Sequence, residues 1–147
     1  MSAEIKYSFH AGADAVARSK WVGDRIDDTE RGWEHCVTME ITRGGEIIGG
    51  VVFHDYNPEA GTIGMSAAGV TGWLTRRVIA AIHGYVFGIA GCQLAVLDVS
   101  ENNSLMLRVA RAVGYREHRI PRLRGRDEAA MILTLSDDDW RRSKFNR

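Results

Sequence analysis

The sequence has little of what marks several special classes of protein. Only 2 of its 147 residues are cysteine, which excludes a disulfide scaffold and predicts two reduced, buried thiols. It contains no apolar run of about 18 residues, so no helix is expected to cross a membrane. The first residues lack a basic stretch followed by an apolar one, so we expect no signal peptide and a cytoplasmic protein.

The remaining composition is that of an ordinary globular protein. Hydrophobic residues make up 45% of the chain and charged residues 26%, which excludes a disordered tail, a collagen-like fibre and a coiled coil. No repeat or linker interrupts the sequence. We therefore expect one domain over residues 1–147.

The net charge is zero, but it is unevenly distributed. Residues 1–75 hold 6 basic and 11 acidic residues, whereas residues 76–147 hold 13 basic residues, 12 of them arginine, and 8 acidic ones. The arginine-rich half predicts an anionic ligand there. Because the whole chain is not basic, charge alone does not indicate a DNA-binding protein.

Hydrophobic periodicity predicts strands that alternate with helices. Strands are expected at residues 4–9, 37–42, 47–56, 62–68, 93–99, 115–120 and 129–135. Helices are expected at residues 13–26, at residues 71–87 with Thr71 as the cap, and from Ser100 or Asn102 to Val113. The stretch at residues 24–32 is expected to be a surface loop, and a short turn begins at Ser136. This order predicts an α/β (α+β) domain with a mixed sheet and helices on its faces.

The familiar catalytic signatures are missing. The sequence contains no H-x-x-x-H pair and no C-x-x-C, so no metal site is expected. It also contains no G-x-S-x-G elbow and no Walker loop. Gly45 and Gly49 lie inside an expected hairpin, where we interpret them as turn and bulge positions.

One stretch nevertheless suggests a ligand. A strand of small residues, Met65 to Gly69, leads into an expected helix start, where backbone N–H groups and the helix dipole favour an anion. Arg76 and Arg77 follow, against the electrostatic preference of a helix start. They indicate either a bound phosphate or a solvated surface. Asn103 can likewise be interpreted either as a ligand contact or as a helix cap.

Residues 62–115 resemble the GCN5-related N-acetyltransferase (GNAT) family. The segment Leu74–Phe87, which ends in tyrosine-x-phenylalanine, is similar to the long cofactor helix of the ribosomal-protein N-terminal acetyltransferase branch. Asn103, followed eleven residues later by Gly114-Tyr115, matches the spacing of that family. The chain also resembles small acetyltransferase-like proteins of phages and prophages, including the segment at residues 119–125.

The resemblance implies a mostly antiparallel GNAT-like sheet and acetyl-CoA as the acetyl donor for an amine acceptor. It places the pantetheine arm between strands 62–68 and 93–99 and the pyrophosphate on residues 70–74. The donor-binding residues implied in this way are Met65, Ser66, Ala67, Ala68, Thr71, Gly72, Trp73, Leu74, Arg76 and Asn103. Small side chains at positions 66–69 agree with a ligand that approaches the backbone closely.

The sequence departs from the family pattern at three places. Of the glycine fingerprint only Gly72 remains, and the bulky Trp73 follows it where a small residue is usual. Ala110 stands where many members have a tyrosine that protonates the thiolate. The strand at residues 62–68 carries no carboxylate, so the glutamate base of some members is missing.

Several residues remain as candidates for the chemistry. Tyr115 and His118 are candidate proton-transfer residues, because a phenol and an imidazole can both exchange protons. His54, Tyr56 and Arg119 are candidates for the acceptor pocket; a hairpin-end surface cluster explains the first two equally well. The arginines at positions 116, 119, 122, 124 and 126 indicate a coenzyme A phosphate, an acidic acceptor, a nucleic-acid backbone or a solvated loop.

Three functions therefore follow from the sequence. The first is an acetyl-CoA-dependent N-acetyltransferase. The alternative is a repurposed, non-catalytic GNAT-fold protein that binds a nucleic acid or a protein, which the reduced glycine motif and the arginine run favour. The third, a modifier of phage DNA bases, rests only on the phage resemblance. Strand edges and four tryptophans are compatible with a homodimer, and no membrane partner is expected.

Overall fold

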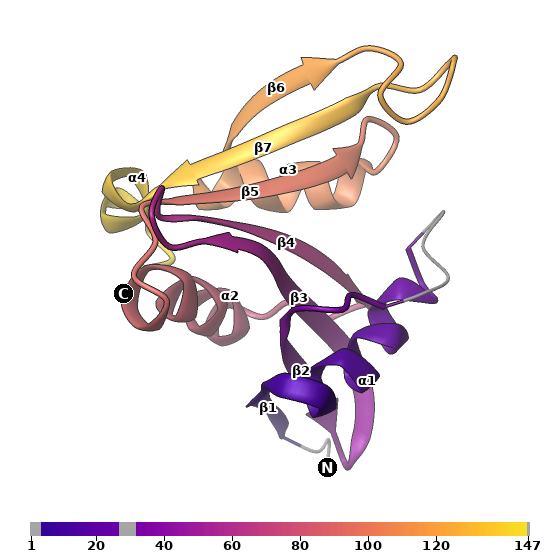
Figure 1. The fold of residues 1–147 in the computed structure, drawn as a ribbon, viewed down its shortest axis with the longest axis vertical. Helices are drawn as coiled ribbons and strands as arrows, with labels where there is room; N and C mark the ends of the chain where they lie inside the picture. Colours follow the sequence, from indigo (N-terminus) through magenta and orange to yellow (C-terminus); the bar gives the residue numbers. More distant parts are fainter. Residues whose placement is uncertain (1–3, 27–31, 147) are drawn as a thin grey trace. The chain divides into compact units, whose positions relative to one another are not determined.

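The computed structural model describes residues 4–26 and 32–146 and forms them into a seven-stranded sheet with helices (Figure 1). The strands are β1 (Ile5–His10), β2 (Val37–Arg43), β3 (Glu46–Asn57), β4 (Thr62–Gly69), β5 (Leu94–Ser100), β6 (Arg116–Ile120) and β7 (Ala130–Ser136). The helices are α1 (Gly12–Gly23), α2 (Arg76–Gly84) with its π-helical continuation η1 (Tyr85–Ile89), α3 (Ser104–Val113) and α4 (Asp137–Arg142).

The strand order within this sheet is β1-β2-β3-β4-β5-β7-β6. Antiparallel pairing joins β1 to β2, β2 to β3, β5 to β7 and β6 to β7. A register shift in the β2–β3 ladder falls between Ile41 and Thr42, opposite Gly49 and Ile47. The predicted α+β class, the mostly antiparallel sheet and the order of the elements are confirmed.

Two boundaries differ from the prediction. The helix expected from residue 71 begins at Arg76, because Gly72 has a φ of +87°, a left-handed conformation that an α-helix excludes. Its cap is Thr75, whose hydroxyl accepts the Val78 N–H at 3.2 Å, so the prediction of Thr71 as the cap is wrong. The final turn is a short helix, α4, capped by Ser136. The loop expected at 24–32 includes residues 27–31, which lie outside the described residues.

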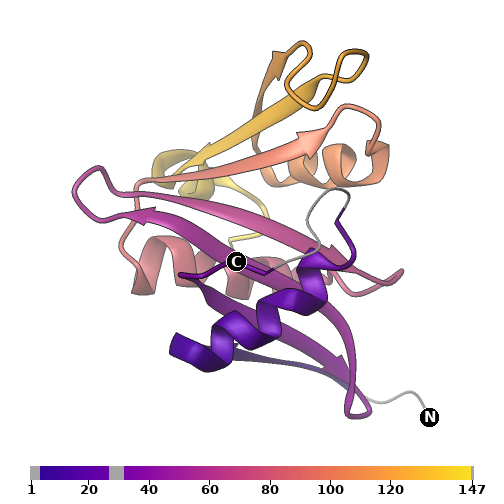
Figure 2. The same ribbon diagram turned by 45° about the vertical axis from the view of Figure 1, so that its right-hand side comes forward.

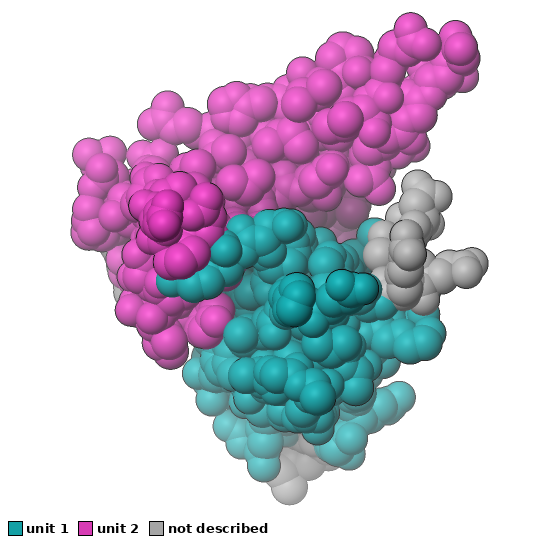
Figure 3. Space-filling model, in the orientation of Figure 1, with its two compact units in different colours: residues 1–56, 65–82 teal, residues 57–64, 83–147 magenta. Residues whose placement is uncertain are grey.

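The chain forms two compact units (Figure 3). Unit 1 comprises residues 1–56 and 65–82, and unit 2 comprises residues 57–64 and 83–147. Strand β4 contributes to both, because the boundary falls between Gly64 and Met65. The expectation of a single domain therefore stays a prediction.

In unit 1, helix α1 packs on the sheet beside β2 (Figure 2). The hydroxyl of buried Thr38 donates a hydrogen bond to the carbonyl of Ala15 at 2.9 Å. On the opposite face, Met39 and Val51, which are paired in the β2–β3 ladder, are also buried. Strand alternation thus gives unit 1 two covered faces.

In unit 2, the core forms around β5 and β7. Leu133 and Leu135 of β7 are fully buried, and Gly114, with a φ of +120°, ends α3 close to Leu135. A C-terminal glycine in this conformation accommodates a backbone geometry that other residues resist. Gly114 is therefore the residue at which α3 ends.

Candidate functional site

The loop between β4 and α2 is held by its own main chain. The N–H of Val70 donates to the carbonyl of Ile48 at 2.8 Å, and the N–H of Trp73 donates to the carbonyl of Val70 at 3.1 Å. Gly72 lies at the exposed tip of this turn, and a Cβ there would meet no atom within 4 Å. The space over Gly72 is therefore open.

The side chain of Trp73 is turned away from this space and into the core. It is 7% exposed. A Cβ on Gly49 would lie 2.4 Å from its ring, and one on Gly69 would lie 2.3 Å from it. The indole thus occupies the sheet surface that these two glycines leave vacant on β3 and β4. The interpretation of Gly49 as a bulge position missed its role in making room for the indole. The only indication of this role in the sequence was the spacing of Gly49 and Gly69 relative to Trp73.

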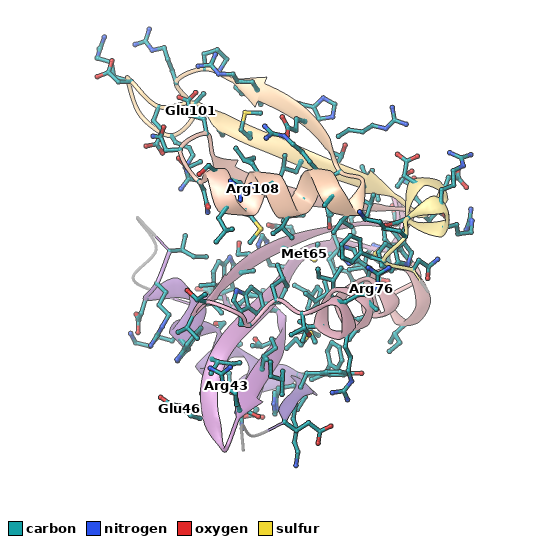
Figure 4. All side chains as sticks on the ribbon, turned by 180° about the vertical axis from the view of Figure 1, so that it is seen from behind. Arg43, Glu46, Met65, Arg76, Glu101 and Arg108 are labelled. Atoms are coloured by element: carbon teal, nitrogen blue, oxygen red, sulfur yellow. The ribbon has the colours of Figure 1, made fainter. Side chains whose placement is uncertain are left out.

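The remaining predicted donor-binding residues of unit 1 follow one another along β4 and the loop. Met65 is buried, whereas Ser66, Ala67 and Ala68 are half-buried. Thr71 and Arg76 are exposed, and Leu74 is half-buried. Figure 4 labels Met65 on β4 and Arg76 at the first residue of α2.

The two arginines at the start of α2 differ in their surroundings. Arg77 donates to the carbonyl of Ile5 at 3.0 Å, and its guanidinium lies 5.0 Å from the centre of the Tyr7 ring. These contacts explain Arg77 as an anchor for β1. Arg76 is exposed and is the cation nearest in sequence to the Gly72 turn.

The Gly72 turn and the start of α2 fit the phosphate-bearing end of coenzyme A. A pyrophosphate needs N–H donors, positive charge and room for close approach. The turn offers an open surface at Gly72, the start of α2 offers the positive end of its dipole, and Arg76 offers a guanidinium. Small side chains on β4 leave its backbone approachable.

A second group of side chains lies on β3 and β4. His54 Nε2 is 2.9 Å from the hydroxyl of Ser66, and His54 Nδ1 is 2.6 Å from Asp55 Oδ2. The imidazole stacks on the indole of Trp33, with ring centres 5.4 Å apart. The structure thus brings together His54, which was predicted to line the acceptor pocket, and Ser66, which was predicted to bind the donor. Tyr56, from the same strand, is 51% exposed.

Tyr115 lies in the core of unit 2. Its hydroxyl is hydrogen bonded to His83 Nε2 at 2.6 Å, and the His83 ring stacks on Trp140. Burial raises the pKa of the Tyr115 phenol above its ordinary value, because the charged form is poorly solvated there. The phenol therefore stays protonated near neutral pH and cannot serve as a base.

The other predicted residues of unit 2 have defined partners. The side-chain oxygen of Asn103 accepts the Met106 N–H at 3.2 Å, so Asn103 caps α3. The prediction that this helix begins at Ser100 or Asn102 is therefore wrong. His118 Nε2 lies 3.2 Å from the Thr134 hydroxyl. Arg119 pairs with Glu101 at 3.1 Å.

The arginine run is largely neutralised within unit 2. Arg116 pairs with Asp139 at 2.9 Å, and Arg124 pairs with Asp98 and with Glu128, each at 3.2 Å. Together with the Arg119–Glu101 pair, these contacts account for three arginines of the run. They favour a charge-balanced surface over a basic patch for nucleic acid.

In the part of the chain that the structure describes, no group of three or more histidine, cysteine, aspartate or glutamate side chains is placed to hold a metal ion. Nor does any helix there have the length and apolar character needed to cross a bilayer.

Comparison with known proteins identifies the fold of this chain. No protein-family model matches the sequence, and no curated protein matches it. Among solved structures, a Salmonella typhimurium protein described as an acetyltransferase, with its cofactor acetyl-CoA, is similar with a TM-score of 0.70 at 15% identity, over 90% of this chain and 93% of that one. The ribosomal-protein-S5-alanine acetyltransferase of Vibrio fischeri is similar with a TM-score of 0.68 at 13% identity, over 95% and 98%.

The spermidine/spermine N-acetyltransferase of Vibrio cholerae is similar with a TM-score of 0.71 at 11% identity, over 95% of this chain and 96% of that one. Each of these likenesses extends over nearly the full length of both chains. The chain therefore has the fold of GNAT acetyltransferases, as the resemblance implied. The predicted tie to phage proteins stays a prediction.

Proposed function

We propose that this protein is an N-acetyltransferase that moves an acetyl group from acetyl-CoA to an amine. The observation that carries the proposal is the open Gly72 turn before α2, which the buried Trp73 side chain leaves clear. The fold supports it, because the Salmonella typhimurium structure of the same fold is described with acetyl-CoA.

In this proposal, the Val70–Thr75 loop and Arg76 hold the phosphates of the donor. The main chain at Met65–Ala68 lies along the acyl arm, and one of its N–H groups polarises the thioester carbonyl. Asn103, which caps α3 through its side-chain oxygen, stays a proposed donor contact. When bound, acetyl-CoA supplies the activated acetyl carbon.

The acceptor is an amine, which the protein must hold in line with the thioester. His54, Tyr56 and Arg119 are the proposed acceptor contacts, and His118 is a proposed proton carrier near neutral pH. Tyr115, whose phenol is buried and protonated, stays a proposed proton donor. The acceptor types worth testing first are those in the names of the neighbours, a polyamine and a peptide with N-terminal alanine.

Isothermal titration with acetyl-CoA tests donor binding, and two glycines provide a matched pair of variants. Gly72 and Gly45 have similar left-handed φ values, +87° and +81°, and a Cβ at either meets no atom within 4 Å. Alanine at either position therefore strains the backbone to a similar degree. Only Gly72→Ala adds a methyl group at the proposed site, so it should weaken acetyl-CoA binding by about tenfold or more, roughly 1.4 kcal/mol, while Gly45→Ala should not.

A second pair of variants tests whether the positive charge of Arg76 contributes to acetyl-CoA binding. Arg76→Ala should weaken acetyl-CoA binding in a salt-dependent way, whereas Arg43→Ala, at the end of β2 (Figure 4), should leave it unchanged. A folded protein that binds no acetyl-CoA at millimolar concentration contradicts the proposal. If that protein also shifts DNA in a salt-sensitive gel assay, the nucleic-acid-binding alternative is the better one.

A further inference from the structure

Unit 1 contains a chain of hydrogen bonds with the order serine, histidine, aspartate. The hydroxyl of Ser66 on β4 is 2.9 Å from His54 Nε2, and His54 Nδ1 is 2.6 Å from Asp55 Oδ2. The side chain of His54 is 16% exposed and that of Asp55 is 85% exposed. In this order, a carboxylate fixes the ring and leaves the far nitrogen facing a hydroxyl.

The backbone explains why two neighbouring residues of a strand can meet. Successive side chains of a regular strand point to opposite faces, so His54 and Asp55 should be separated by the sheet. Asp55 instead has a φ of +52°, one of only two positive values among the non-glycine residues that the structure describes. This turn interrupts the alternation and brings the Asp55 carboxylate to the ring of His54. Such outliers often mark functional positions.

The indole of Trp33 covers one face of the His54 imidazole. The two rings are nearly parallel, with an angle of 8° between them. The main-chain N–H of Trp33 donates to the hydroxyl of Ser19 in α1 at 3.0 Å, which fixes the segment that carries the indole. The stack therefore holds the plane of the imidazole in place.

The group lies on the face of the sheet opposite to Trp73. A Cβ on Gly50 would contact Val22 of α1, whereas a Cβ on Gly49 would contact Trp73. His54 follows Gly50 by an even number of residues and therefore shares the α1 face. His54 and the Trp73 indole therefore lie on opposite faces of the sheet, so the indole does not cover the imidazole.

We propose that His54 accepts the proton that the acceptor amine loses during acetyl transfer, that Ser66 relays this proton, and that Asp55 positions the ring. This inference rests on the proposed function. As the amine nitrogen bonds to the acetyl carbon, its proton passes to Ser66 Oγ while the proton of Ser66 passes to His54 Nε2. The bond between the acetyl carbon and sulfur breaks, and the thiolate is then protonated by His54 or by water. The relay supplies the base that a strand without a carboxylate lacks.

A second, similar chain on β1 provides a control. The hydroxyl of Ser8 is 2.9 Å from His10 Nε2, and His10 Nδ1 is 3.0 Å from Asp14 Oδ2. Strand β1 is at the edge of the sheet, three positions from β4 in the strand order. The same contacts far from the donor strand should contribute nothing to the reaction.

The test uses the full chain and follows release of coenzyme A from acetyl-CoA with spermidine, with an alanine-initiated peptide and with water alone. His54→Ala should lower kcat by about 100-fold or more and leave acetyl-CoA binding by titration unchanged. Added imidazole should restore part of the rate above the enzyme-free level. Asp55→Asn, which keeps a side chain tolerant of positive φ, should lower kcat at least about tenfold. His10→Ala should match the wild type.

The outcomes separate the two proposals. A wild-type protein that turns over none of these acceptors overturns both the proposed function and the relay. A wild-type protein that turns over, with His54→Ala and Asp55→Asn equally active, overturns the relay alone. A peptide mass showing acetyl on Ser66 also overturns it, because Ser66 would then be a nucleophile rather than a relay. If His54→Ala does not fold, the Asp55→Asn rate decides, since that side chain is exposed and the substitution removes only charge.

Discussion

The indole of Trp73 lies directly on the main chain of Gly69, so closely that a Cβ at position 69 would be 2.3 Å from the ring. The bulky tryptophan that stands where a small residue is usual is thus part of the core of unit 1. Its large side chain fills the space left by the missing side chain of Gly69 and fixes the loop that carries Gly72. Each of the two residues requires the other.

The contact between Trp73 and Gly69 predicts that a methyl group added at position 69 destabilises the protein. Gly69→Ala should lower the free energy of unfolding by about 1–3 kcal/mol, because an overpacked core must shift side chains or backbone. Combined with Trp73→Leu, the same substitution should cost much less than it does alone. Chemical denaturation checks both values.

Gly84→Ala is the control for this substitution. Gly84 has helical φ and ψ, and a Cβ there meets no atom within 4 Å, so alanine should stabilise the protein by up to about 1 kcal/mol. Equal costs for Gly69→Ala and Gly84→Ala would contradict the contact.

Two threonines near α2 should differ in their contribution to stability. Thr75→Ala removes the hydroxyl that accepts the Val78 N–H, and we expect a loss of about 1 kcal/mol, as for other helix caps. Thr71→Ala should leave the free energy of unfolding unchanged, because Thr71 lies before the turn at Gly72. Denaturant titration of the two variants would refute the assignment of the cap if their costs were reversed.

Tyr115 should titrate only when the protein unfolds. Because burial raises its folded pKa above the ordinary value of 10.0, the unfolded chain loses this proton first, and stability falls as pH rises through that value. Spectrophotometric titration should therefore show one of the 4 tyrosines ionising with unfolding. Tyr115→Phe should abolish that delayed step and cost about 1–3 kcal/mol through the lost bond to His83. A native protein whose tyrosines all ionise near pH 10 would contradict the burial.

Acid should weaken unit 2 through two carboxylates. The Ala129 N–H and then Arg119 lower the pKa of Glu101 below its ordinary 4.5, and Arg116 lowers that of Asp139 below 3.8. The unfolded chain takes up these protons first, so the contribution is complete above about pH 5 and is lost as pH falls through the folded values. Glu101→Gln should flatten the acid limb of a plot of stability against pH. An unchanged limb would show that the contacts contribute nothing to stability.

The sequence by itself determined the order of strands and helices and, through the family resemblance of residues 62–115, the GNAT-like class. Alternating apolar residues, paired glycines in turns and helical apolar stripes are local signals, and each needs only a few neighbouring residues to be read. The Gly114 stop of α3 is of this kind, since a glycine after an apolar helix favours the left-handed end. The start of α2 was missed because Gly72 adopts a left-handed conformation that no local pattern indicated, and this moves the start of the helix to Arg76.

The tertiary structure alone decided where side chains from distant segments meet. Nothing local indicates that Trp73 fills the surface left by Gly49 and Gly69, or that Tyr115 is buried on His83. Nor can a pattern show that the backbone at Asp55 turns its carboxylate onto His54 while Ser66 approaches from β4. These contacts depend on which face of the sheet each residue occupies, and that is set by strand pairing and register over many residues at once.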